Sequence, residues 1–498
     1  MMKRALKIFL AAASLMLIFF SFGAYAAESE AVLSDKINSV SAFNNVGYMT
    51  ISWEKYPDAL SYEVQRSVND GKWGKVYSVT DSSFKDKNTK NGNIYTYRVR
   101  AVTENGKSDY STVSNMYLGS PVIKSVKSTA EGLSVKWKRC TVPTGYLVYR
   151  KAEGEKEYTL IATIKGNTPK YTDKKVSSGK KYSYKIKQIS GEYTSAYKEK
   201  GTTATFIAYV KKLTASNSPK GVMLNWKAVK GAKGYSVWRK TGDKGKWKKI
   251  GTVKTKGGCA YNDKTTAYGK KNYYRVRAWK SSKVYGAYSK EAFLYSVNPN
   301  KPMVALTYDD GPYAPATNRI LDTLEKYESR ATFFVVGSRV DTYADCIRRE
   351  ASLGCEIANH TFSHPILTTC EPKVIKEEIS KTDKLIKKYS GKDVRLVRAP
   401  GGAVSDKVRE NVKHPLVNWS VDTLDWDHRT ASKTVSSIKA RAFDGAIILM
   451  HDLYLPTAAA SEEAIPYLVS KGYQLVTVSE MFEAKGIVPE KGVLYTRG

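Results

Sequence analysis

The chain has 498 residues, of which 42% are hydrophobic and 11% aromatic, and its formal net charge is +34. This length predicts about three or four domains, and the hydrophobic content excludes a mostly disordered chain. The charge is unevenly distributed: residues 121–300 hold 40 Lys and Arg against 10 Asp and Glu, a net of +30, whereas residues 301–498 hold 27 against 26. The basic character therefore belongs to the middle of the protein.

The N-terminus predicts export. Three basic residues precede an apolar run over residues 8–22, and Ala24 and Ala26 supply the small residues of a signal-peptidase site. We predict a signal peptide over residues 1–26. The alternative is an uncleaved membrane anchor, because the apolar run is only slightly short for a membrane span. In both cases the rest of the chain is expected outside the cell, secreted or associated with the cell wall, and it contacts a membrane only if the signal is uncleaved.

The cysteines do not indicate a disulfide framework, because they are few and odd in number for an exported chain of this size. They are Cys140, Cys259, Cys346, Cys355 and Cys370. One pair among the last three is close enough in sequence to bridge, but buried free thiols are the expected state. No CxxC motif is present, which argues against a thiolate zinc site.

Three internal repeats follow the predicted signal. Each contains a tryptophan at the end of an alternating segment, a Tyr-x-Val-x-Arg segment that starts nine residues later, and a second tyrosine-led segment near its end. Alternation with period 2, frequent turn residues and no helical periodicity predict a small antiparallel sandwich for each repeat. The pattern resembles fibronectin type III domains. The boundaries we expect are 33–119 for repeat 1, 120–207 for repeat 2 and 208–297 for repeat 3.

The side chains of the repeats divide into two sets. Trp53, Trp137 and Trp226, together with the tyrosines, fall at inward-facing positions and are expected to pack the cores. The lysines and arginines alternate with them and face solvent. The net charge of +30 over residues 121–300 exceeds what solubility requires, so we expect either a soluble spacer or a region that binds anionic wall polymers. No nucleic-acid-binding motif is present, and no specific nucleic-acid partner is expected.

From residue 301 the pattern changes to alternating strands and helices. A helix is predicted to begin at Pro372 and to end before Gly391, a residue typical of helix C-terminal ends. Alternation of strand and helix indicates a parallel sheet, and about seven units favour a closed or nearly closed barrel with functional residues at the carboxyl ends of its strands. The predicted strands cover residues 303–307, 331–336, 356–358, 395–397, 416–421, 446–450 and 474–478.

Two adjacent carboxylates, Asp309 and Asp310, follow the first of these strands. Like charges raise each other's pKa, so the pair requires compensation, such as a metal ion beside one and a cation beside the other. All five histidines of the chain lie after residue 300, and His360 and His364 follow the third predicted strand. Two imidazoles and a carboxylate predict a metal site with open positions for water and substrate.

Five motifs occur in order, and together they resemble a known family. They are TYDDGP (307–312), HTFSH (360–364), RAPGG (398–402), DTLDW (422–426) and LMHD (449–452). This set closely resembles the motifs of NodB-type polysaccharide deacetylases, carbohydrate esterase family 4, over residues 300–486. Within that family the peptidoglycan N-acetylglucosamine deacetylases have the most similar architecture. The resemblance implies a deformed (β/α) barrel that removes N-acetyl groups from cell-wall amino sugars with one divalent metal ion, zinc, cobalt or a similar ion.

The resemblance also implies a role for each motif at the metal. Asp310, His360 and His364 would be the metal ligands. Asp309 would be the catalytic base, and Arg398 would pair with it. This assignment agrees with the physical argument above, because the cation and the metal each compensate one aspartate.

The same resemblance assigns the remaining site residues. His451 would be the general acid, oriented by Asp425, and an acid is needed because an amine is a poor leaving group. Trp426 and Leu449 would line the acetate pocket, and the backbone N–H of Gly401 would meet the oxyanion.

Two positions depart from the family pattern. Tyr308 replaces the usual phenylalanine before the aspartates, which is a mild change at a packing position. Gly401 stands where the family commonly has tyrosine or phenylalanine, so an aromatic wall beside the sugar is lost. The second change bears on the identity of the sugar more than on the chemistry.

Four other functions fit part of the pattern. Non-haem iron oxygenases use the same ligand trio, but their usual all-β scaffold does not match the alternating strands and helices. A chitooligosaccharide deacetylase or an acetyl-xylan O-deacetylase would use the same residues as a peptidoglycan deacetylase. An inactive wall-binding protein is the remaining alternative, and the intact ligands, base and acid argue against it.

Overall fold

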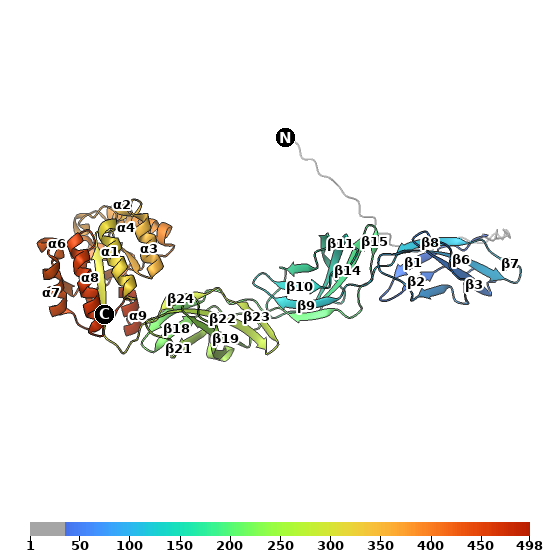
Figure 1. Cartoon of the computed structure of the whole chain (residues 1–498), viewed down its shortest axis with the longest axis horizontal. Coiled ribbons are helices and arrows are strands. Elements are labelled where there is room, and N and C mark those ends of the chain that lie inside the picture. Colours follow the sequence, from blue (N-terminus) through green and yellow to red (C-terminus); the bar gives the residue numbers. More distant parts are fainter. Residues whose placement is uncertain (1–34) are drawn as a thin grey trace, which may run out of the picture. The chain divides into compact units, whose positions relative to one another are not determined.

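The computed structural model describes residues 35–498 (Figure 1), so the predicted signal peptide of residues 1–26 lies outside the described residues. By their internal contacts these residues form two units. One ends at Ser120 and also contains Ile189–Ala196, and the other comprises Pro121–Gln188 and Tyr197–Gly498. Within residues 35–498, no helix has the length and apolar character needed to cross a membrane.

Repeat 1 consists of two antiparallel sheets. One has the order β1-β2-β5, and the other has the order β4-β3-β6-β7 with β8 also paired to β6. Residues of β6 alternate between buried and partly buried positions, as the period-2 pattern of the sequence predicts. The strands are β1 (Ser41–Asn44), β2 (Met49–Ser52), β3 (Ser61–Val68), β4 (Tyr77–Val79), β5 (Ser83–Asp86), β6 (Ile94–Thr103), β7 (Gly106–Lys107) and β8 (Ser111–Met116).

Repeats 2 and 3 each have the same pair of sheets. In repeat 2 these are β13-β10-β9 and β12-β11-β14-β15, with β16 on β14; in repeat 3 they are β17-β18-β21 and β20-β19-β22-β23, with β24 on β22. The strands of repeat 2 are β9 (Ile123–Ser128), β10 (Leu133–Trp137), β11 (Gly145–Ala152), β12 (Thr159–Lys165), β13 (Lys170–Asp173), β14 (Lys181–Ser190), β15 (Tyr193–Thr194) and β16 (Thr202–Thr205). The elements of repeat 3 are β17 (Thr214–Ser218), β18 (Gly221–Asn225), β19 (Gly234–Thr241), β20 (Lys248–Lys254), η1 (Thr255–Gly257), β21 (Ala260–Asp263), β22 (Lys271–Ser281), β23 (Val284–Tyr288) and β24 (Ala292–Tyr295).

The repeat tryptophans are buried, as predicted. In repeat 3, Trp226 lies edge-on against Tyr235 with ring centroids 5.3 Å apart, and both side chains belong to the hydrophobic core of that repeat. The corresponding pairs are Trp53 with Tyr62 at 5.2 Å and Trp137 with Tyr146 at 5.1 Å. This arrangement confirms that the aromatic residues of the pattern serve core packing.

An Arg–Asp–Tyr contact joins the two sheets of each repeat, and the sequence analysis did not single it out. In repeat 3 the fully buried carboxylate of Asp263 in β21 accepts hydrogen bonds from Arg239 of β19 at 2.7 Å and from Tyr274 of β22 at 3.0 Å. Because the aspartate belongs to one sheet and its two partners to the other, the contact fixes the sheets against each other. The equivalent residues are Arg66, Asp86 and Tyr97 in repeat 1 and Arg150, Asp173 and Tyr184 in repeat 2.

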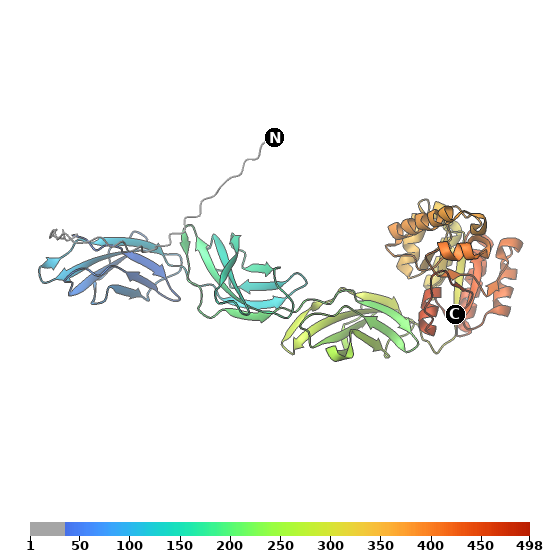
Figure 2. The same cartoon turned by 180° about the vertical axis from the view of Figure 1, so that it is seen from behind.

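The region from residue 301 onwards forms a parallel sheet surrounded by helices, as Figures 1 and 2 show from opposite sides. The sheet has the order β27-β26-β25-β30-β29, with β31 also paired to β25, and β28 pairs with β32. The strands are β25 (Met303–Asp309), β26 (Thr332–Val335), β27 (Glu356–Asn359), β28 (Leu416–Val417), β29 (Val421–Asp422), β30 (Ala446–His451), β31 (Gln474–Leu475) and β32 (Leu494–Tyr495). The helices are α1 (Ala314–Lys326), α2 (Gly337–Val340), α3 (Ala344–Leu353), η2 (Leu367–Thr369), α4 (Pro372–Ser390), η3 (Pro400–Gly402), α5 (Asp406–Asn411), α6 (Asp425–His428), α7 (Ala431–Arg441), α8 (Leu455–Ser470) and α9 (Val478–Lys485).

Three of the predicted strands were wrong: one is absent, one is divided and one is shorter than predicted. Residues 395–397 form only isolated parallel bridges through Val397, so no strand is present there. The predicted strand over residues 416–421 is divided into β28 and β29. The chain changes partners between them, because Asn418 donates its backbone N–H to Tyr495 and Ser420 donates to Ile447.

The last predicted strand, over residues 474–478, ends early at Leu475. Thr477 instead caps α9, and the side chain of Glu480 returns to the Thr477 backbone N–H in a reciprocal capping box. The Thr-x-x-Glu spacing that produces this box was present in the sequence as a helix-start signal.

The predicted helix is confirmed. Helix α4 begins at Pro372, and Gly391 ends it in the left-handed conformation with a φ of 70°. The prediction of buried free thiols is confirmed in part: all five cysteines are free, but only Cys346 and Cys355 are buried and the other three are partly buried.

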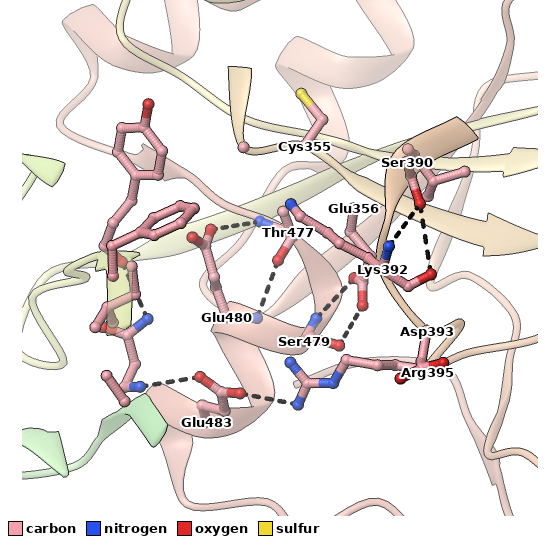
Figure 3. A pocket seen from close by; sticks show the side chains of 17 residues that line it. Cys355, Glu356, Ser390, Lys392, Asp393, Arg395, Thr477, Ser479, Glu480 and Glu483 are labelled. Atoms are coloured by element: carbon pink, nitrogen blue, oxygen red, sulfur yellow. Dashed lines mark hydrogen bonds and ion pairs between the residues drawn. The ribbon is translucent and has the colours of Figure 1, made fainter. Parts of the chain in front are cut away.

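A pocket opens at the end of the sheet opposite Asp309. Its lining includes Glu356, the first residue of β27, and Thr477, which follows β31. Figure 3 shows Glu483 of α9 beside Arg395, whose guanidinium donates to it at 2.8 Å. None of the residues predicted to be catalytic, metal-binding or substrate-binding lines this pocket, so the candidate site lies at the other end of the sheet.

We predict that Asp263→Ala destabilises repeat 3 by about 3 kcal/mol, because it leaves the Arg239 guanidinium and the Tyr274 hydroxyl without their buried partner. Hydrogen exchange of the β22 amides in the full chain, measured by mass spectrometry, reports this local stability. Glu291→Ala, at an exposed position of the same repeat, is the control and should change stability by less than about 0.5 kcal/mol. Equal protection of β22 in both variants would contradict the structural role of Asp263.

Candidate functional site

The carboxyl ends of the strands bring the predicted site residues together. Asp309 ends β25 and His451 ends β30, and the two stand opposite each other in the parallel register. His360 directly follows β27, and Arg398 directly follows the bridge residue of the neighbouring segment. Asp425 begins α6, three residues after the end of β29 at Asp422. Residues separated by more than 140 positions in sequence therefore meet at one edge of the sheet.

Three side chains at this edge fit a divalent metal ion. Oδ1 of Asp310 lies 3.0 Å from Nε2 of His364 and 3.4 Å from Nε2 of His360. One potential ligand atom from each of the three residues lies within 4.8 Å of the other two. Ligand atoms about 2.0–2.1 Å from a tetrahedral zinc ion lie about 3.3 Å from one another. The Asp310 oxygen is also buried without a hydrogen-bond partner, which a bound cation would compensate.

The tautomer of His360 leaves its outer nitrogen free to bind a metal. Nδ1 of His360 lies 2.8 Å from the backbone carbonyl oxygen of Arg398. A carbonyl only accepts, so Nδ1 carries the proton and donates it, and Nε2 keeps its lone pair towards Asp310. Such a hydrogen bond behind a histidine is typical of metal ligands, because it fixes both tautomer and ring orientation.

The pKa of Asp310 suits an anionic ligand beside imidazoles. Burial alone would raise this pKa, but the neighbouring imidazoles of His360 and His364 outweigh burial and place it well below its usual range. The neighbouring Asp310 carboxylate raises the pKa of His364, and burial opposes this effect. Asp310 is therefore ionised at neutral pH.

Asp309 is held by a buried cation instead. Arg398 is fully buried, and its Nη1 donates to Oδ1 of Asp309 at 2.6 Å and to Oγ1 of Thr307 at 2.9 Å. Its Nε and Nη2 donate to the carbonyl oxygens of Val417 at 3.0 Å and Asn418 at 3.1 Å. The guanidinium is thus fixed on several sides, and burial lowers its pKa without removing its charge.

The second oxygen of Asp309 points towards the candidate metal site. Its Oδ2 lies 3.7 Å from Nε2 of His360. One oxygen therefore contacts Arg398 and the other lies beside the metal ligands, where a carboxylate can accept a proton from a bound water. The two adjacent aspartates thus have different surroundings.

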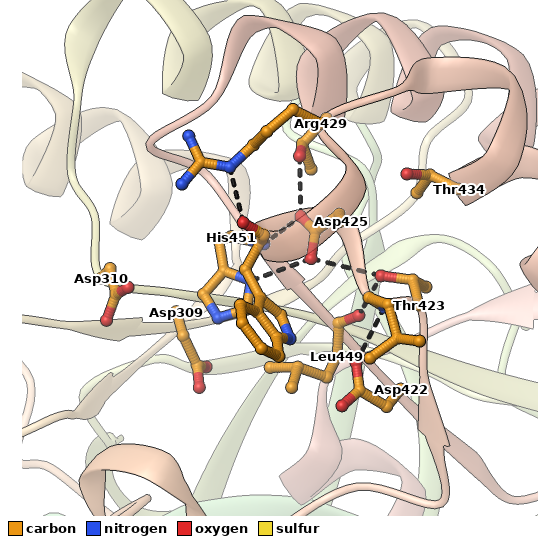
Figure 4. Close-up of polar contacts among 12 residues, drawn as sticks. Asp309, Asp310, Asp422, Thr423, Asp425, Arg429, Thr434, Leu449 and His451 are labelled. Carbon is orange, nitrogen blue, oxygen red and sulfur yellow. Dashed lines mark hydrogen bonds and ion pairs between the residues drawn. The ribbon is translucent and has the colours of Figure 1, made fainter.

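His451 and Asp425 form a second buried pair. Oδ1 of Asp425 accepts from Nδ1 of His451 at 2.9 Å, and Oδ2 accepts from the His451 backbone N–H at 2.9 Å. Thr457 and Thr423 also donate to this carboxylate, at 2.7 and 3.3 Å. Figure 4 shows the Asp309 carboxylate beyond the His451 ring from Asp425. Burial opposes protonation of the imidazole, but the Asp425 hydrogen bond and charge outweigh it and raise the pKa of His451 to about 9.

The three residues predicted to contact substrate come from three different elements, β30, α6 and η3. Leu449 is buried in β30 and precedes His451 by two residues, so both side chains lie on the same face of the strand. Trp426 follows Asp425 in α6 and is 47% exposed. Gly401 is exposed in η3 with a φ of 63°, and a Cβ atom there would lie 3.4 Å from the Ile366 side chain.

A buried acid at the site was missed by the sequence analysis, although it belongs to the LMHD motif. Asp452 accepts a hydrogen bond from Thr317 of α1 at 2.5 Å, and burial raises its pKa to about 7. Burial likewise raises the pKa of Glu350 in α3 well above its usual value, and the charge of Asp452 adds to the effect. The same motif thus supplies His451 to the open side and Asp452 to the interior.

The two histidines outside the motifs, His414 and His428, are partly buried and have partners of their own. Nε2 of His414 lies 3.4 Å from a carboxylate oxygen of Asp383. His428 is also partly buried, and its Nε2 lies 3.1 Å from the carbonyl oxygen of Thr423. Neither belongs to the metal-binding trio.

Comparison with known proteins gives two family matches. Residues 296–415 match the polysaccharide deacetylase family, and residues 44–111 match a PBP1-like, fibronectin3-like domain. The first match contains the aspartate pair, the two histidine ligands and Arg398. The second lies within repeat 1.

Three relatives with assigned activities are similar to the C-terminal part of the chain. The peptidoglycan-N-acetylmuramic acid deacetylase PdaC of Bacillus subtilis is 44% identical over 190 residues, covering 38% of this chain and 41% of PdaC. The peptidoglycan-N-acetylglucosamine deacetylase PgdA of Listeria monocytogenes is 39% identical over 182 residues, covering 36% and 39%. A peptidoglycan-N-acetylglucosamine deacetylase of Bacillus cereus is 33% identical over 201 residues, covering 39% of this chain and 73% of that protein. The chain thus spans about two fifths of the length of PdaC and PgdA.

We predict that Asp425→Asn lowers the pKa of His451 from about 9 to its usual value or below, because Asp425 raises it and burial opposes it. NMR titration of the imidazole in metal-free protein measures this pKa. Since the folded-state pKa is raised, the pair stabilises the fold fully below about pH 6.5, and this contribution is lost as the pH rises through about 9. Asp427→Asn, an exposed change in the same helix, is the control. A titration midpoint that stays near 9 in Asp425→Asn would show that a group other than Asp425 raises the pKa of His451.

Proposed function

The chain belongs to the polysaccharide deacetylase family, and from this premise we propose that it hydrolyses N-acetyl groups of cell-wall amino sugars, peptidoglycan N-acetylglucosamine in particular. The single observation that carries the proposal is the pairing of two adjacent aspartates with different partners, Asp309 with Arg398 and Asp310 with two histidines. The relatives that act on peptidoglycan support the choice of polymer.

In this proposal Asp310, His360 and His364 hold one divalent metal ion, zinc in the first place, with cobalt or another divalent ion as alternatives. Such an ion, when bound, polarises the amide carbonyl and lowers the pKa of a coordinated water. The buried, unpartnered oxygen of Asp310 and the proton on Nδ1 of His360 support this ligand set.

The proton transfers are assigned to two side chains on opposite sides of the reacting carbonyl. Asp309 accepts the proton of the attacking water, and the adjacent Arg398 holds this carboxylate in place through a 2.6 Å hydrogen bond. His451 is the general acid that donates its Nε2 proton to the leaving amine, since Asp425 binds Nδ1 and favours the charged ring. A protonated donor is needed because the C–N bond breaks to give an amine.

The acetyl group is assigned to the space beside these residues. Leu449 and Trp426 form its apolar walls, and the backbone N–H of Gly401 is available to the oxyanion. The missing aromatic side chain at position 401 leaves the sugar side of the site wider than in the family pattern, with Ile366 as the neighbouring apolar side chain.

The rest of the chain is proposed to place this site at the wall. We infer three fibronectin-III-like sandwiches over residues 33–119, 120–207 and 208–297, followed by a deformed (β/α) barrel over residues 300–486. The basic region of residues 121–300 is proposed to contact anionic wall polymers, consistent with an extracellular, wall-associated or secreted protein.

We predict that the two aspartates respond differently to the same substitution. Asp309→Asn should keep bound metal and lower kcat by about 10²–10⁴, because it removes the base. Asp310→Asn should lose metal, because an amide is a poorer and uncharged ligand. Metal content by elemental analysis, measured beside kcat, distinguishes the two. If Asp309→Asn empties the site while Asp310→Asn keeps its metal, the assignment is reversed.

We further predict that peptidoglycan glycan strands release acetate faster than chitooligosaccharides or acetylated xylan of similar acetyl content. Mass spectrometry of acetate and of the products measures all three rates. Removal of metal with a chelator should abolish each rate, and added Zn²⁺ or Co²⁺ should restore it. Faster release from acetylated xylan would assign the protein to O-deacetylation, and full turnover by metal-free protein would exclude the mechanism.

A further inference from the structure

The outer face of the larger sheet in repeat 3 carries a ladder of alternating aromatic rings and arginines. The Arg275 guanidinium of β22 lies over the rings of Trp247 at 4.2 Å and Tyr288 at 3.8 Å. The Arg277 guanidinium lies over Tyr288 at 4.7 Å and over Tyr285 at 4.1 Å. Both arginines are partly buried against these rings, and Tyr285 is 45% exposed. The strands involved, β19, β22 and β23, are adjacent in the sheet (Figure 1).

These two arginines have no carboxylate partner among residues 35–498. The ion pairs of repeat 3 involve Arg239, Lys270 and Lys271, and neither ladder arginine takes part in one. Nε of Arg275 is buried and has no hydrogen-bond partner. Stacking satisfies the faces of the guanidinium groups but leaves their N–H edges without acceptors.

Repeat 1 has the same ladder, but both of its arginines have polar partners within the repeat. Arg98 lies 4.3 Å from the rings of both Trp73 and Tyr110, and Arg100 lies 4.5 Å from Tyr110. Here, however, Glu63 of β3 binds Arg100 at 2.7 Å, and Gln65 accepts two hydrogen bonds from Arg98, at 2.9 and 2.6 Å.

Strand register explains the difference between the two repeats. Glu63 stands opposite Arg100 in repeat 1, whereas Ser236 stands opposite Arg277 at the same place in repeat 3. A second position also differs, because Trp238 stands opposite Arg275 where Gln65 stands opposite Arg98 in repeat 1. These two positions separate an internally paired ladder from one whose charge is available to an external anion. The exposed Lys249, opposite Trp238 on the neighbouring strand, adds a further positive charge to this face.

The aromatic rings of the ladder serve as supports rather than as stacking platforms. A ring that binds a nucleobase or a sugar must present a free face, but Tyr288 is covered by both Arg275 and Arg277. The groups left to a ligand are the guanidinium edges, whose paired N–H donors match the oxygens of a phosphate. Arg275 and Arg277 are alternate residues of one strand, so their Cα atoms lie about 7 Å apart, which favours a polymer with repeated charges.

We propose that this face of repeat 3 binds the phosphate groups of a phosphodiester-linked wall polymer through Arg275 and Arg277. The inference rests on the proposed wall association of the basic repeats, and it restricts that association to one surface. General basicity would distribute binding over all exposed lysines of residues 121–300. The proposed site instead depends on two arginines that are oriented by rings and lack an internal counter-charge.

The test measures binding of purified poly(glycerol phosphate) to the full chain by isothermal titration calorimetry. We expect Arg275→Gln/Arg277→Gln to weaken binding by about tenfold or more, because two charge-assisted contacts are lost. Ser236→Glu should produce a similar loss with both arginines still in place, because it introduces the carboxylate that Glu63 supplies in repeat 1. The matched control is Arg98→Gln/Arg100→Gln, which removes the same two positive charges from the internally paired ladder of repeat 1. This variant should leave the affinity within about twofold. Added salt should weaken binding of the wild-type chain.

Three outcomes would overturn the proposal. Unchanged affinity in both repeat 3 variants would show that the ladder does not bind the polymer. An equal loss in the repeat 1 control would show that only total charge matters. Binding of polygalacturonate or mixed-sequence single-stranded DNA as tight as that of poly(glycerol phosphate), at equal charge, would exclude a phosphodiester wall polymer as the specific ligand.

Acetate release from a soluble chitooligosaccharide tests the proposed enzymatic function independently of polymer binding. All variants should retain this activity, because none of the changed residues belongs to the catalytic machinery. Normal acetate release without polymer binding by the wild-type chain would exclude the polymer site alone. Polymer binding that depends on Arg275 and Arg277, in a chain without deacetylase activity, would support the site and exclude the enzyme.

Discussion

The candidate site depends on the buried guanidinium of Arg398. A fully buried charge is costly unless it is paired and fully hydrogen-bonded. Here the side chain binds Asp309, while the backbone carbonyl of the same residue accepts the Nδ1 proton of His360. One residue thus orients both the proposed base and a proposed metal ligand. Loss of Arg398 would leave the Asp309 charge buried without its partner and would remove a constraint on the metal trio.

The break between β28 and β29 follows from the same requirement that the buried guanidinium of Arg398 be fully hydrogen-bonded. The carbonyl oxygens of Val417 and Asn418 accept from the guanidinium at 3.0 and 3.1 Å. These residues lie where the predicted strand over 416–421 is divided into β28 and β29. A regular strand would commit its carbonyl groups to neighbouring strands, so the break makes acceptors available to a buried cation. The interruption in the sheet and the geometry of the site are therefore connected.

In the repeats, the contacts that stabilise the fold involve different residues from those that determine the surface charge. All three retain the inter-sheet Arg–Asp–Tyr contact and the Trp–Tyr core pair. Their outer faces differ, because Glu63 of repeat 1 is replaced by Ser236 at the corresponding register position of repeat 3. A substitution on the outer face changes the available charge without disturbing the buried contacts. Similar folds can thus carry internally paired arginines on the surface of one repeat and unpaired arginines on that of another.

The sequence by itself determined the order of the motifs, the buried aromatic pattern of the repeats and helix α4, because these depend on local spacing and periodicity. Only the tertiary structure decided which aspartate contacts which partner. Asp309 ends a strand, whereas Asp310 adopts a φ of 68°, so the neighbouring side chains diverge towards Arg398 and towards the histidines. The proton on Nδ1 of His360 and the missing partner of Arg275 were likewise invisible in the sequence. Each depends on which atoms the parallel or antiparallel register brings opposite, and that register joins residues far apart in the chain.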